Sequence, residues 1–359
     1  MDRPHTGSSL HSNESPVQKE FCIELPEPYL SCHAPSICEL PSGDLLACCF
    51  AGTQELEGGP DQVTLGARFD KRRGSWSKPA IWVDVPQRAS GNPRVFVGPN
   101  SGEVWLVAPV SYGEWCGGST RLFLKRSYDE GMNWKDLELL VDEKGILGKN
   151  KPFIRDNLCI LPVEEEAEWN PKFLLSEDGG ESWELVGDLG REAGVRIIQP
   201  TLVQLRDGTL LAYMRSQENY IYQSRSEELG HSWSRATPTG LPNNNSGIDM
   251  VRLSSGNLVL VYNPTQLVTD QQQRDAGLPE NMVGFTTWGP RTPLAAALSE
   301  DEAKSWPHQL VLENGPGVYA YPAVIQGQDQ AIHIVYTFER TAIRHMRIEE
   351  AELLSGKAG

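Results

Sequence analysis

The stretch SEDGGESW (residues 176–183) decides the fold, because nearly the same phrase recurs along the chain. Its copies are SYDEGMNW (127–134), SEELGHSW (226–233) and SEDEAKSW (299–306), with a more divergent copy, RFDKRRGSW, that ends at Trp76. The pattern S-x-D-x-G-x-x-W is typical of a tight turn between strands. The Asp carboxylate accepts bonds from backbone N–H groups, the Gly takes a positive φ, and the Trp packs under the next strand. The repeats therefore predict a series of equivalent β-units.

A second repeated phrase precedes these turns and has the form of a strand, a Gly-centred turn and a strand. Its copies are ELPSGDLLACC, GPNSGEVWLVA, QLRDGTLLAYM, RLSSGNLVLVY and QGQDQAIHIVY, and the shorter FIRDNLCILPV fills the remaining gap. Together the two phrases predict an all-β fold of six four-stranded antiparallel units, each of about 40 to 60 residues. This period is typical of the blades of a β-propeller.

The expected domain organisation is a single six-bladed propeller over residues 21–350, with a disordered leader over 1–20 and a C-terminal tail over 351–359. The blades are expected at 31–80, 91–140, 150–188, 197–238, 246–312 and 320–350. A strand near FCIELP is expected to join the last blade and close the ring, and the tail EEAELLSGK is helical by pattern.

Composition excludes several classes of partner. The net charge of −16 argues against nucleic acid, which needs a surplus of Lys and Arg, and no apolar run has the length of a membrane span. Seven cysteines without zinc-ligand spacing favour reduced thiols. With no visible signal peptide we expect a cytoplasmic location, or a secreted protein if the sequence is a processed form. We expect no cofactor and no metal. An anionic small-molecule or glycan ligand would need a local cationic pocket.

The innermost strand of each propeller blade starts beside the central channel, so residues at equivalent first positions form a ring. Every residue at these positions is polar: His33, Asn92, Lys151, Gln199, Asp249 and Tyr321. Strands that pack against neighbouring blades have no packing reason to begin with polar side chains. The ring therefore predicts a binding site, although polar residues also line water-filled channels that bind nothing.

Further candidates come from the ends of the second strands and the starts of the third strands, which return to the same rim. They are Asp61, Arg121, Arg215, Tyr220, Asn263 and Arg291, with Arg344 in the last blade. Guanidinium groups bind carboxylates in a bidentate geometry that Lys cannot reproduce. We therefore predict that Arg215, Arg291 and Lys151 clamp the carboxylate of an anionic ligand.

One segment is longer than a hairpin needs, the insert loop at 264–290, which ends in aromatic residues. Loops of this length are often functional lids. Trp288 and Phe285 are candidates to stack on a sugar ring or to pack together. The loop YGEWCGG (112–118) is expected on the opposite side of the rim.

The S-x-D-x-G-x-x-W turns, called Asp boxes, resemble those of the sialidase-like family of six-bladed propellers with bacterial-neuraminidase repeats. Six further segments carry the same resemblance: HAPSICELPSGDLL, GILGKNKP, IQPTLVQLRDGTLLAYMRS, TGLPNNNSGIDMVRL, RTPLAAALSEDEAKSW and YAYPAVIQ. The resemblance covers about residues 29–348. It implies the propeller fold and an enzyme that cleaves a glycosidic bond next to an acidic sugar.

By this resemblance Tyr321 or its neighbour Tyr319 corresponds to the nucleophilic tyrosine, and Asp61 to the acid/base. Arg215 and Arg291 correspond to two of three arginines that bind the sugar carboxylate. The sequence departs from the family pattern at two places. The position of the first arginine carries His33, in CHAPSI, and the position of the glutamate that activates the tyrosine carries Gln199.

These departures leave several functions open. In a sialidase-like hydrolase, Asp61, Tyr321 and His33 are the predicted catalytic residues, and a lyase acting on rhamnose-glucuronate linkages would use His33 as base. A non-hydrolytic binding propeller and a cyclase of intracellular small-molecule biosynthesis are further alternatives. The predicted substrate-binding residues are Lys151, Arg215, Arg291, Asn92, Gln199, Asp249, Asn263, Arg344 and Trp288.

Overall fold

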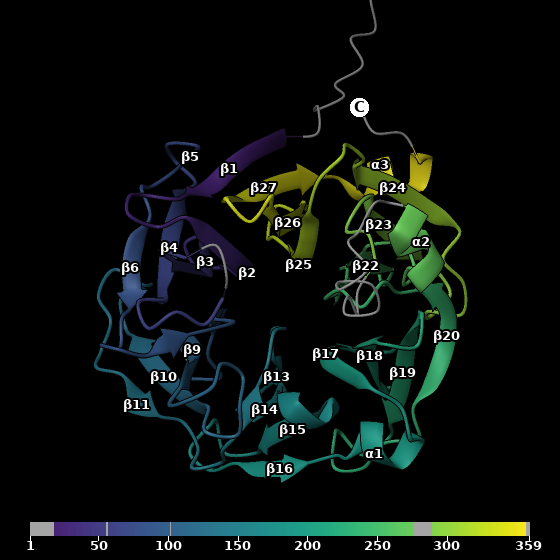
Figure 1. Cartoon of the computed structure of the whole chain (residues 1–359), viewed down its shortest axis with the longest axis horizontal. Helices are drawn as coiled ribbons and strands as arrows, with labels where there is room; N and C mark the ends of the chain where they lie inside the picture. Colours follow the sequence, from purple (N-terminus) through teal and green to yellow (C-terminus); the bar gives the residue numbers. More distant parts are fainter. Residues whose placement is uncertain (1–17, 55–56, 101, 276–288, 357–359) are drawn as a thin grey trace, which may run out of the picture.

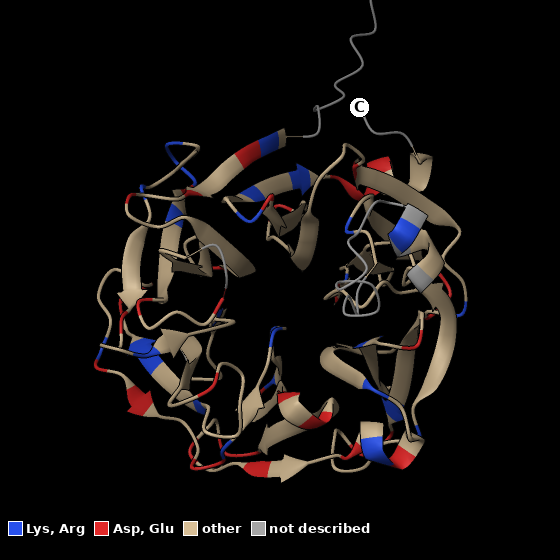
Figure 2. Cartoon of the chain, in the orientation of Figure 1, with Lys and Arg blue, Asp and Glu red and all other residues tan. Residues whose placement is uncertain are grey.

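The computed structural model describes residues 18–54, 57–100, 102–275 and 289–356, which form a ring of six antiparallel sheets (Figure 1). The sheets stand around a central channel like the blades of a propeller, as the repeats predict. Acidic and basic residues are spread round the outer part of the ring (Figure 2). Within the described ranges no helix is long and apolar enough to span a membrane.

The first three blades follow in chain order, and in each of them one strand position is split into two short strands. Their strands are β2 (Ser31–Glu39), β3 (Leu45–Gly52), β4 (Val63–Asp70), β5 (Ser75–Trp76) and β6 (Ala80–Val83), then β7 (Ala89–Ser90), β8 (Arg94–Val97), β9 (Val104–Ser111), β10 (Arg121–Ser127) and β11 (Glu138–Leu139), then β12 (Ile146–Leu147), β13 (Phe153–Arg155), β14 (Leu158–Glu165), β15 (Asn170–Ser176) and β16 (Glu184–Val186).

The other three blades have four strands each, and the last one is completed from the N-terminal end of the chain. Their strands are β17 (Ile197–Gln204), β18 (Leu210–Ser216), β19 (Tyr220–Ser226) and β20 (Thr237–Pro242), then β21 (Asp249–Arg252), β22 (Leu258–Tyr262), β23 (Leu294–Ser299) and β24 (His308–Glu313), then β25 (Tyr319–Gln326), β26 (Ile332–Phe338), β27 (Ala342–Ile348) and β1 (Gln18–Glu24).

The ring is closed by β1, which pairs antiparallel with β27. This closure was predicted for the strand near FCIELP, but β1 begins at Gln18, inside the segment expected to be a leader. The short helices are η1 (Glu166–Glu168), α1 (Leu189–Ala193), α2 (Asp270–Asp275) and α3 (Glu350–Ser355). The helix α3 lies in the tail that the sequence pattern marks as helical.

The blades are held together by apolar clusters that each join two neighbouring sheets. Phe173 of β15 and Ile197 of β17 belong to one such cluster, and Val259 of β22 and Ile334 of β26 belong to another. Because each sheet is buried on both faces in this way, its side chains have fixed neighbours, and the position of each blade follows from the next.

The repeated Ser-Asp turns form the hydrogen bonds that the sequence predicts. At the turn of SEDGGESW, Ser176 Oγ donates to Asp178 Oδ1 (2.8 Å), which also accepts the N–H of Ser182 (3.0 Å), and Ser176 Oγ accepts the N–H of Gly180 (2.8 Å). Equivalent bonds at two other turns lower the pKa of Asp129 and of Asp301 to about 2. These turns therefore hold the third and fourth strands of a blade together.

The innermost strands share a bend at a residue that precedes proline. Ala34, Gln199 and Tyr321 have φ values of 52°, 57° and 54°, and each lies at a break in the strand register. Such a conformation costs about 1–3 kcal/mol for a residue other than glycine and persists only where the surroundings fix it. The split between β7 and β8 falls at Asn92, and that between β12 and β13 includes Lys151, which also precede prolines.

This bend corrects one expectation. Alignment of the internal repeats predicted His33 at the position equivalent to Gln199 and Tyr321, but the equivalent residue in the first blade is Ala34. His33 lies one residue earlier along β2, where it pairs with Phe50 of β3. A periodicity argument alone does not reveal this offset, because the bend breaks the alternation of the strand.

Substitution of Gly180 by alanine tests how tightly the turns fit their neighbours. A Cβ at Gly180 would lie 2.2 Å from the ring of the fully buried Trp105 in the adjacent blade, and the residue has a φ of 91°. Gly208 has nearly the same φ, 92°, but open space around it. We expect Gly180→Ala to lower the free energy of unfolding by about 1–3 kcal/mol more than Gly208→Ala, measured by denaturant titration. Equal losses would mean that backbone strain, and not packing against Trp105, accounts for the loss of stability in Gly180→Ala.

Candidate active site

A cavity of about 700 Å³ lies at one end of the central channel. It is lined by His33, Glu57, Asn92, Trp115, Cys116, Glu166, Gln199, Arg215, Arg291, Val318, Tyr321 and Arg340. The lining contains three guanidinium groups and two carboxyl groups within a protein of net charge −16. The cavity is therefore a local concentration of positive charge in an acidic molecule.

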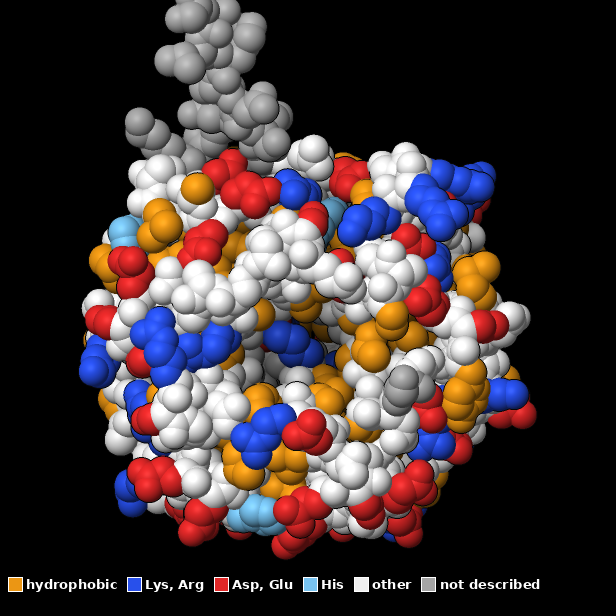
Figure 3. Space-filling model, turned by 180° about the vertical axis from the view of Figure 1, so that it is seen from behind, with side chains coloured by type: hydrophobic (Ala, Val, Ile, Leu, Met, Phe, Trp, Pro, Cys, Tyr) orange, Lys and Arg blue, Asp and Glu red, His pale blue; other side chains and the backbone are white. Residues whose placement is uncertain are grey.

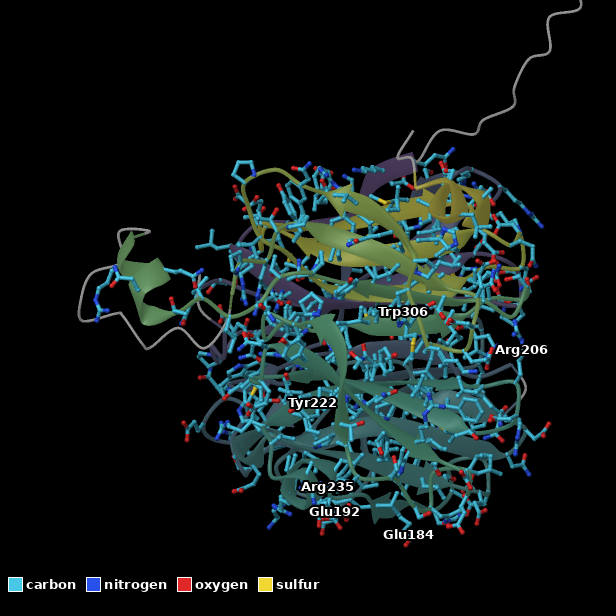
Figure 4. The ribbon with its side chains drawn as sticks, turned by 90° about the vertical axis from the view of Figure 1, so that its right-hand side faces the viewer. Glu184, Glu192, Arg206, Tyr222, Arg235 and Trp306 are labelled. Carbon is cyan, nitrogen blue, oxygen red and sulfur yellow. The ribbon has the colours of Figure 1, made fainter. Side chains whose placement is uncertain are left out.

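The connection between the second and third strands supplies cavity residues in five of the six blades. Glu57 comes from the β3–β4 connection, Trp115 from β9–β10, Glu166 from η1, Arg291 from β22–β23 and Arg340 from β26–β27. The insert in the β22–β23 connection carries α2, which projects from the body of the ring (Figure 4). The ring is also hollowed at its centre when seen from behind (Figure 3). Propeller geometry thus brings residues far apart in sequence to one face.

Tyr321 stands at the centre of the cationic part of the cavity. Its phenol oxygen accepts hydrogen bonds from Arg215 Nη1 (2.5 Å) and Gln199 Nε2 (3.2 Å). The same Nη1 donates to Gln199 Oε1 (3.1 Å), and Arg215 Nε donates to Asn245 Oδ1 (2.7 Å). The phenol oxygen is thus held by two N–H donors, one from a guanidinium group and one from an amide.

His33 packs against this tyrosine as a neutral imidazole. Its ring centroid lies 4.0 Å from that of Tyr321, its Nδ1 lies 2.8 Å from Thr337 Oγ1, and its Nε2 lies 3.5 Å from Arg291 Nη1. Because a guanidinium only donates, Nε2 is the acceptor and Nδ1 carries the proton. Burial, followed by the charges of Arg340, Arg291 and Arg215, holds the pKa of His33 well below its usual value.

Three arginines, Arg215, Arg291 and Arg340, surround His33 and Tyr321. The guanidinium carbons of Arg215 and Arg291 lie 5.7 Å and 5.4 Å from the centroid of the Tyr321 ring. Arg291 Nε is buried and has no hydrogen-bond partner within the described residues. Burial, together with the charges of Arg215 and Arg340, lowers the pKa of Arg291 to about 10. A buried donor without a partner is costly, so this side chain is suited to an anionic ligand.

Arg340 is a cavity residue that the sequence reasoning missed, and Arg344 was predicted in its place. Arg344 lies on β27, donates to Glu313 Oε1 (2.7 Å) and packs 3.9 Å from the ring centroid of Phe338, so it is absent from the cavity lining. Arg340 lies in the β26–β27 connection and pairs with Glu57. The rule that connections between second and third strands return to the rim applies to Arg340, which lies in the β26–β27 connection, and not to Arg344, which lies on β27 itself.

The carboxyl groups of the cavity also differ from the prediction. Asp61 does not line the cavity, and its Oδ2 accepts a hydrogen bond from Thr53 Oγ1. Glu57, four residues earlier in the same loop, lines the cavity instead, as does Glu166. Neither glutamate was predicted, because the loop path and the helical turn η1 have no signature in the repeat.

Several other predicted residues hold the fold below the cavity. Lys151 Nζ contacts both carboxylate oxygens of Asp249 (2.7 and 2.8 Å), and Asp249 Oδ1 also accepts from Thr201 Oγ1 (2.7 Å). Asn263 Nδ2 donates to the carbonyl oxygens of Pro293 and Tyr319 (2.9 Å each). None of these three predicted residues, Lys151, Asp249 and Asn263, lines the cavity.

The remaining predictions divide between the cavity, the periphery and the part of the chain outside the described residues. Asn92 and Gln199 line the cavity, as do the predicted His33, Arg215, Arg291 and Tyr321. Arg121 pairs with Asp142, and Tyr220 is exposed at the start of β19. Trp288 and Phe285 lie outside the described residues, whereas Trp115 and Cys116 of the loop expected opposite them line the cavity.

A second group of charges is buried beside the cavity. Lys149 Nζ donates to Asn150 Oδ1 (2.9 Å) and to the carbonyl oxygens of Pro322 (2.5 Å) and Ile248 (3.3 Å), and burial lowers its pKa to about 7. Because Pro322 follows Tyr321, this ammonium group fixes the bend that positions the tyrosine. Within the described residues no cluster of three or more His, Cys, Asp or Glu side chains could hold a metal ion.

Glu164 is another buried ionisable group, and its protonation state can be tested. Neither carboxyl oxygen has a hydrogen-bond partner within the described residues, and burial, then the charge of Glu166, raises the pKa of Glu164 to about 8. In the unfolded chain the carboxyl group of Glu164 loses its proton near pH 4.5, whereas in the folded chain it keeps the proton until about pH 8. The contribution of this group to the free energy of unfolding is therefore fully present at low pH and is lost as the pH rises toward 8.

We expect Glu164→Gln, which carries no charge at any pH, to match the wild-type free energy of unfolding at pH 5. At pH 9 the variant should be more stable by about 1–3 kcal/mol, measured by denaturant titration at both pH values. Glu168→Gln, at an exposed position of η1, is the control and should show no such pH-dependent gain. A constant difference between wild type and Glu164→Gln at both pH values would contradict the assigned protonation.

Comparison with known proteins gives one family match. The model of the BNR repeat-like domain matches residues 43–334. A curated relative, the anhydrosialidase of Macrobdella decora, is 26% identical over 128 residues, which is 33% of this chain and 17% of the relative. The match therefore spans less than a fifth of the length of that enzyme.

Solved structures of similar fold cover nearly the whole chain. The NanB sialidase from Streptococcus pneumoniae and the leech intramolecular trans-sialidase each align with a TM-score of 0.72 at 12% identity, over 94% and 95% of this chain and 71% of theirs. The intramolecular trans-sialidase from Ruminococcus gnavus aligns with a TM-score of 0.67 at 15% identity, over 90% of this chain and 95% of its own. At these identities the likeness establishes the six-bladed fold.

Proposed function

Because the chain belongs to the family of BNR repeat-like domains, we propose that it is a sialidase-like enzyme that cleaves the glycosidic bond of an acidic sugar in the central cavity. The observation that carries this proposal is the convergence of Arg215, Arg291 and Arg340 around Tyr321. Sialidases and trans-sialidases among the similar structures support the class of sugar.

The arginines supply the recognition of the sugar carboxylate. Guanidinium groups bind carboxylates through paired, charge-assisted hydrogen bonds, and such bonds are strongest where water is excluded. Arg291 has a buried Nε without a partner within the described part of the chain. A cavity of about 700 Å³ is large enough for one acidic sugar and part of the group to which it is linked.

Tyr321 faces the sugar carbon at which the bond breaks. Its oxygen, held by Arg215 and Gln199, is the group placed to stabilise the positive charge that develops on that carbon. Gln199 cannot take a proton as a glutamate would. The tyrosine of this protein is therefore oriented by a guanidinium and an amide, and not by a carboxylate.

Lyase chemistry is the second candidate, because His33 is neutral at physiological pH and has an acceptor nitrogen. In that reaction the imidazole would remove a proton from a uronate while the arginines stabilise the carbanion. An unsaturated product that absorbs in the near ultraviolet would select the lyase, and a saturated free sugar would select the hydrolase.

Replacement of Arg291 by alanine tests the carboxylate site. We expect Arg291→Ala to weaken the binding of sialic acid or glucuronate about 10- to 100-fold, because one charge-assisted bidentate contact is worth roughly 1.5–3 kcal/mol. Isothermal titration calorimetry measures the affinity, and the methyl ester of the same sugar should be far less sensitive. Arg235→Ala, on the outer part of the ring (Figure 4), is the matched control. Unchanged affinity in Arg291→Ala would refute the clamp.

Turnover on a panel of sialosides and uronate-containing glycans, followed by mass spectrometry, tests whether the protein is a glycosidase. The expected result is release of the acidic sugar by the wild-type protein. Binding of an acidic sugar without any product would instead identify a non-hydrolytic binding propeller.

A further inference from the structure

The two carboxyl groups of the cavity have different surroundings, and this difference separates their chemical roles. Glu57 Oε1 pairs with Arg340 Nη1, so it acts as an anion that accepts hydrogen bonds. Within the described residues Glu166 forms no ion pair, and its Oε2 is enclosed without a hydrogen-bond partner. A carboxyl group in such a place is better accommodated as the neutral acid than as the anion.

The groups that face Glu166 come from four elements. Arg215 of β18 contributes positive charge and Glu57 of the β3–β4 loop contributes negative charge, whereas burial holds the neighbouring Glu164 of β14 protonated by raising its pKa to about 8. Cys116 of the β9–β10 loop is half-buried and lines the same cavity, and burial raises the pKa of its thiol well above the usual value. Burial outweighs the effect of Arg215, and together with Glu57 it raises the pKa of Glu166.

We infer that Glu166 is the proton donor to the leaving-group oxygen in the cavity, a role that the sequence pattern assigns to Asp61. The inference rests on the proposed glycosidase function. Its geometric basis is that Glu166 lines the cavity with Tyr321 and the arginines, whereas Asp61 does not. Each of the two residues has one enclosed carboxyl oxygen without a partner among the described residues, so the position in the cavity distinguishes them.

The bonds and protons of this step balance. The bond between the sugar carbon and the leaving oxygen breaks, and its electron pair stays on the oxygen. The proton of Glu166 moves to that oxygen, which departs as an alcohol, and Glu166 is left as a carboxylate. The cationic sugar is stabilised by its own carboxylate and by the Tyr321 oxygen. Water then adds to the sugar carbon and returns a proton to Glu166.

Glu166→Gln tests the inference, since it keeps the size of the side chain and removes the acidic proton. The leaving group provides the decisive comparison. An aryl glycoside of the acidic sugar, such as the 4-nitrophenyl glycoside, expels a weakly basic phenolate that needs little protonation, whereas a sugar alcohol needs it fully. Glu168→Gln, two residues later and exposed, is the control with expected wild-type activity.

We expect Glu166→Gln to lose about 10²- to 10⁴-fold in kcat/KM on the sugar-linked substrate and less than about 10-fold on the aryl glycoside. The alkaline limb of the wild-type pH profile on the sugar-linked substrate, which reports loss of the acidic proton, should be absent from the variant. A thermal melt and the affinity for the free acidic sugar show that the variant keeps its fold and site.

Equal losses on both substrates, or no loss on either, would overturn the role of Glu166 while leaving the glycosidase function intact. Loss of activity in Asp61→Asn with the same dependence on the leaving group would reassign the proton donor to Asp61. If the wild-type protein cleaves neither substrate, the proposed function fails and the role of Glu166 fails with it.

Discussion

A buried carboxylate, Asp249, joins the innermost strands of the last four blades of the ring, and the shape of the channel depends on it. It accepts hydrogen bonds from Lys151, from Thr201 of β17 and from the backbone N–H of Val324 in β25, and it lies at the start of β21. The carboxylate is 1% exposed. A buried anion is stable only when it is paired and fully hydrogen-bonded, so these partners and Asp249 fix one another. The bends that place Gln199 and Tyr321 lie beside this network.

The charges around the channel therefore serve two different purposes. Lys149, Lys151 and Asp249 have their hydrogen-bonding capacity satisfied within the protein, and they hold inner strands of several blades together. Arg291 and Glu166 keep a buried polar atom without a partner in the described part of the molecule. Unsatisfied groups of this kind are costly in a finished fold, and a cavity beside them is where a ligand recovers that cost.

His33 and Gln199, the two positions at which the sequence departs from the pattern it resembles, both lie in the cavity. His33 is neutral, so it adds no charge, and Arg340 reaches the same cavity from the last blade. The amide of Gln199 and the guanidinium of Arg215 both contact the Tyr321 oxygen. Three guanidinium groups thus line the cavity that contains the tyrosine, and in our proposal the proton-donating role falls to Glu166 and not to Asp61.

The architecture could be predicted from the amino-acid sequence alone. The Ser-Asp turns and the strand phrases repeat, and a repeated local pattern can only be satisfied by repeated, equivalent blades, so the six sheets and the closing strand near residue 21 were predictable. The sequence also predicted His33, Asn92, Gln199, Arg215, Arg291 and Tyr321 as cavity residues, because polar side chains at inner-strand starts or strand ends have no packing purpose. Three features follow only from the three-dimensional structure: Lys151 pairs with Asp249, Arg340 lines the cavity and Arg344 does not, and the carboxyl groups of the cavity are Glu57 and Glu166 and not Asp61. Those outcomes depend on loop paths and on distances between blades, which no local pattern in the chain encodes.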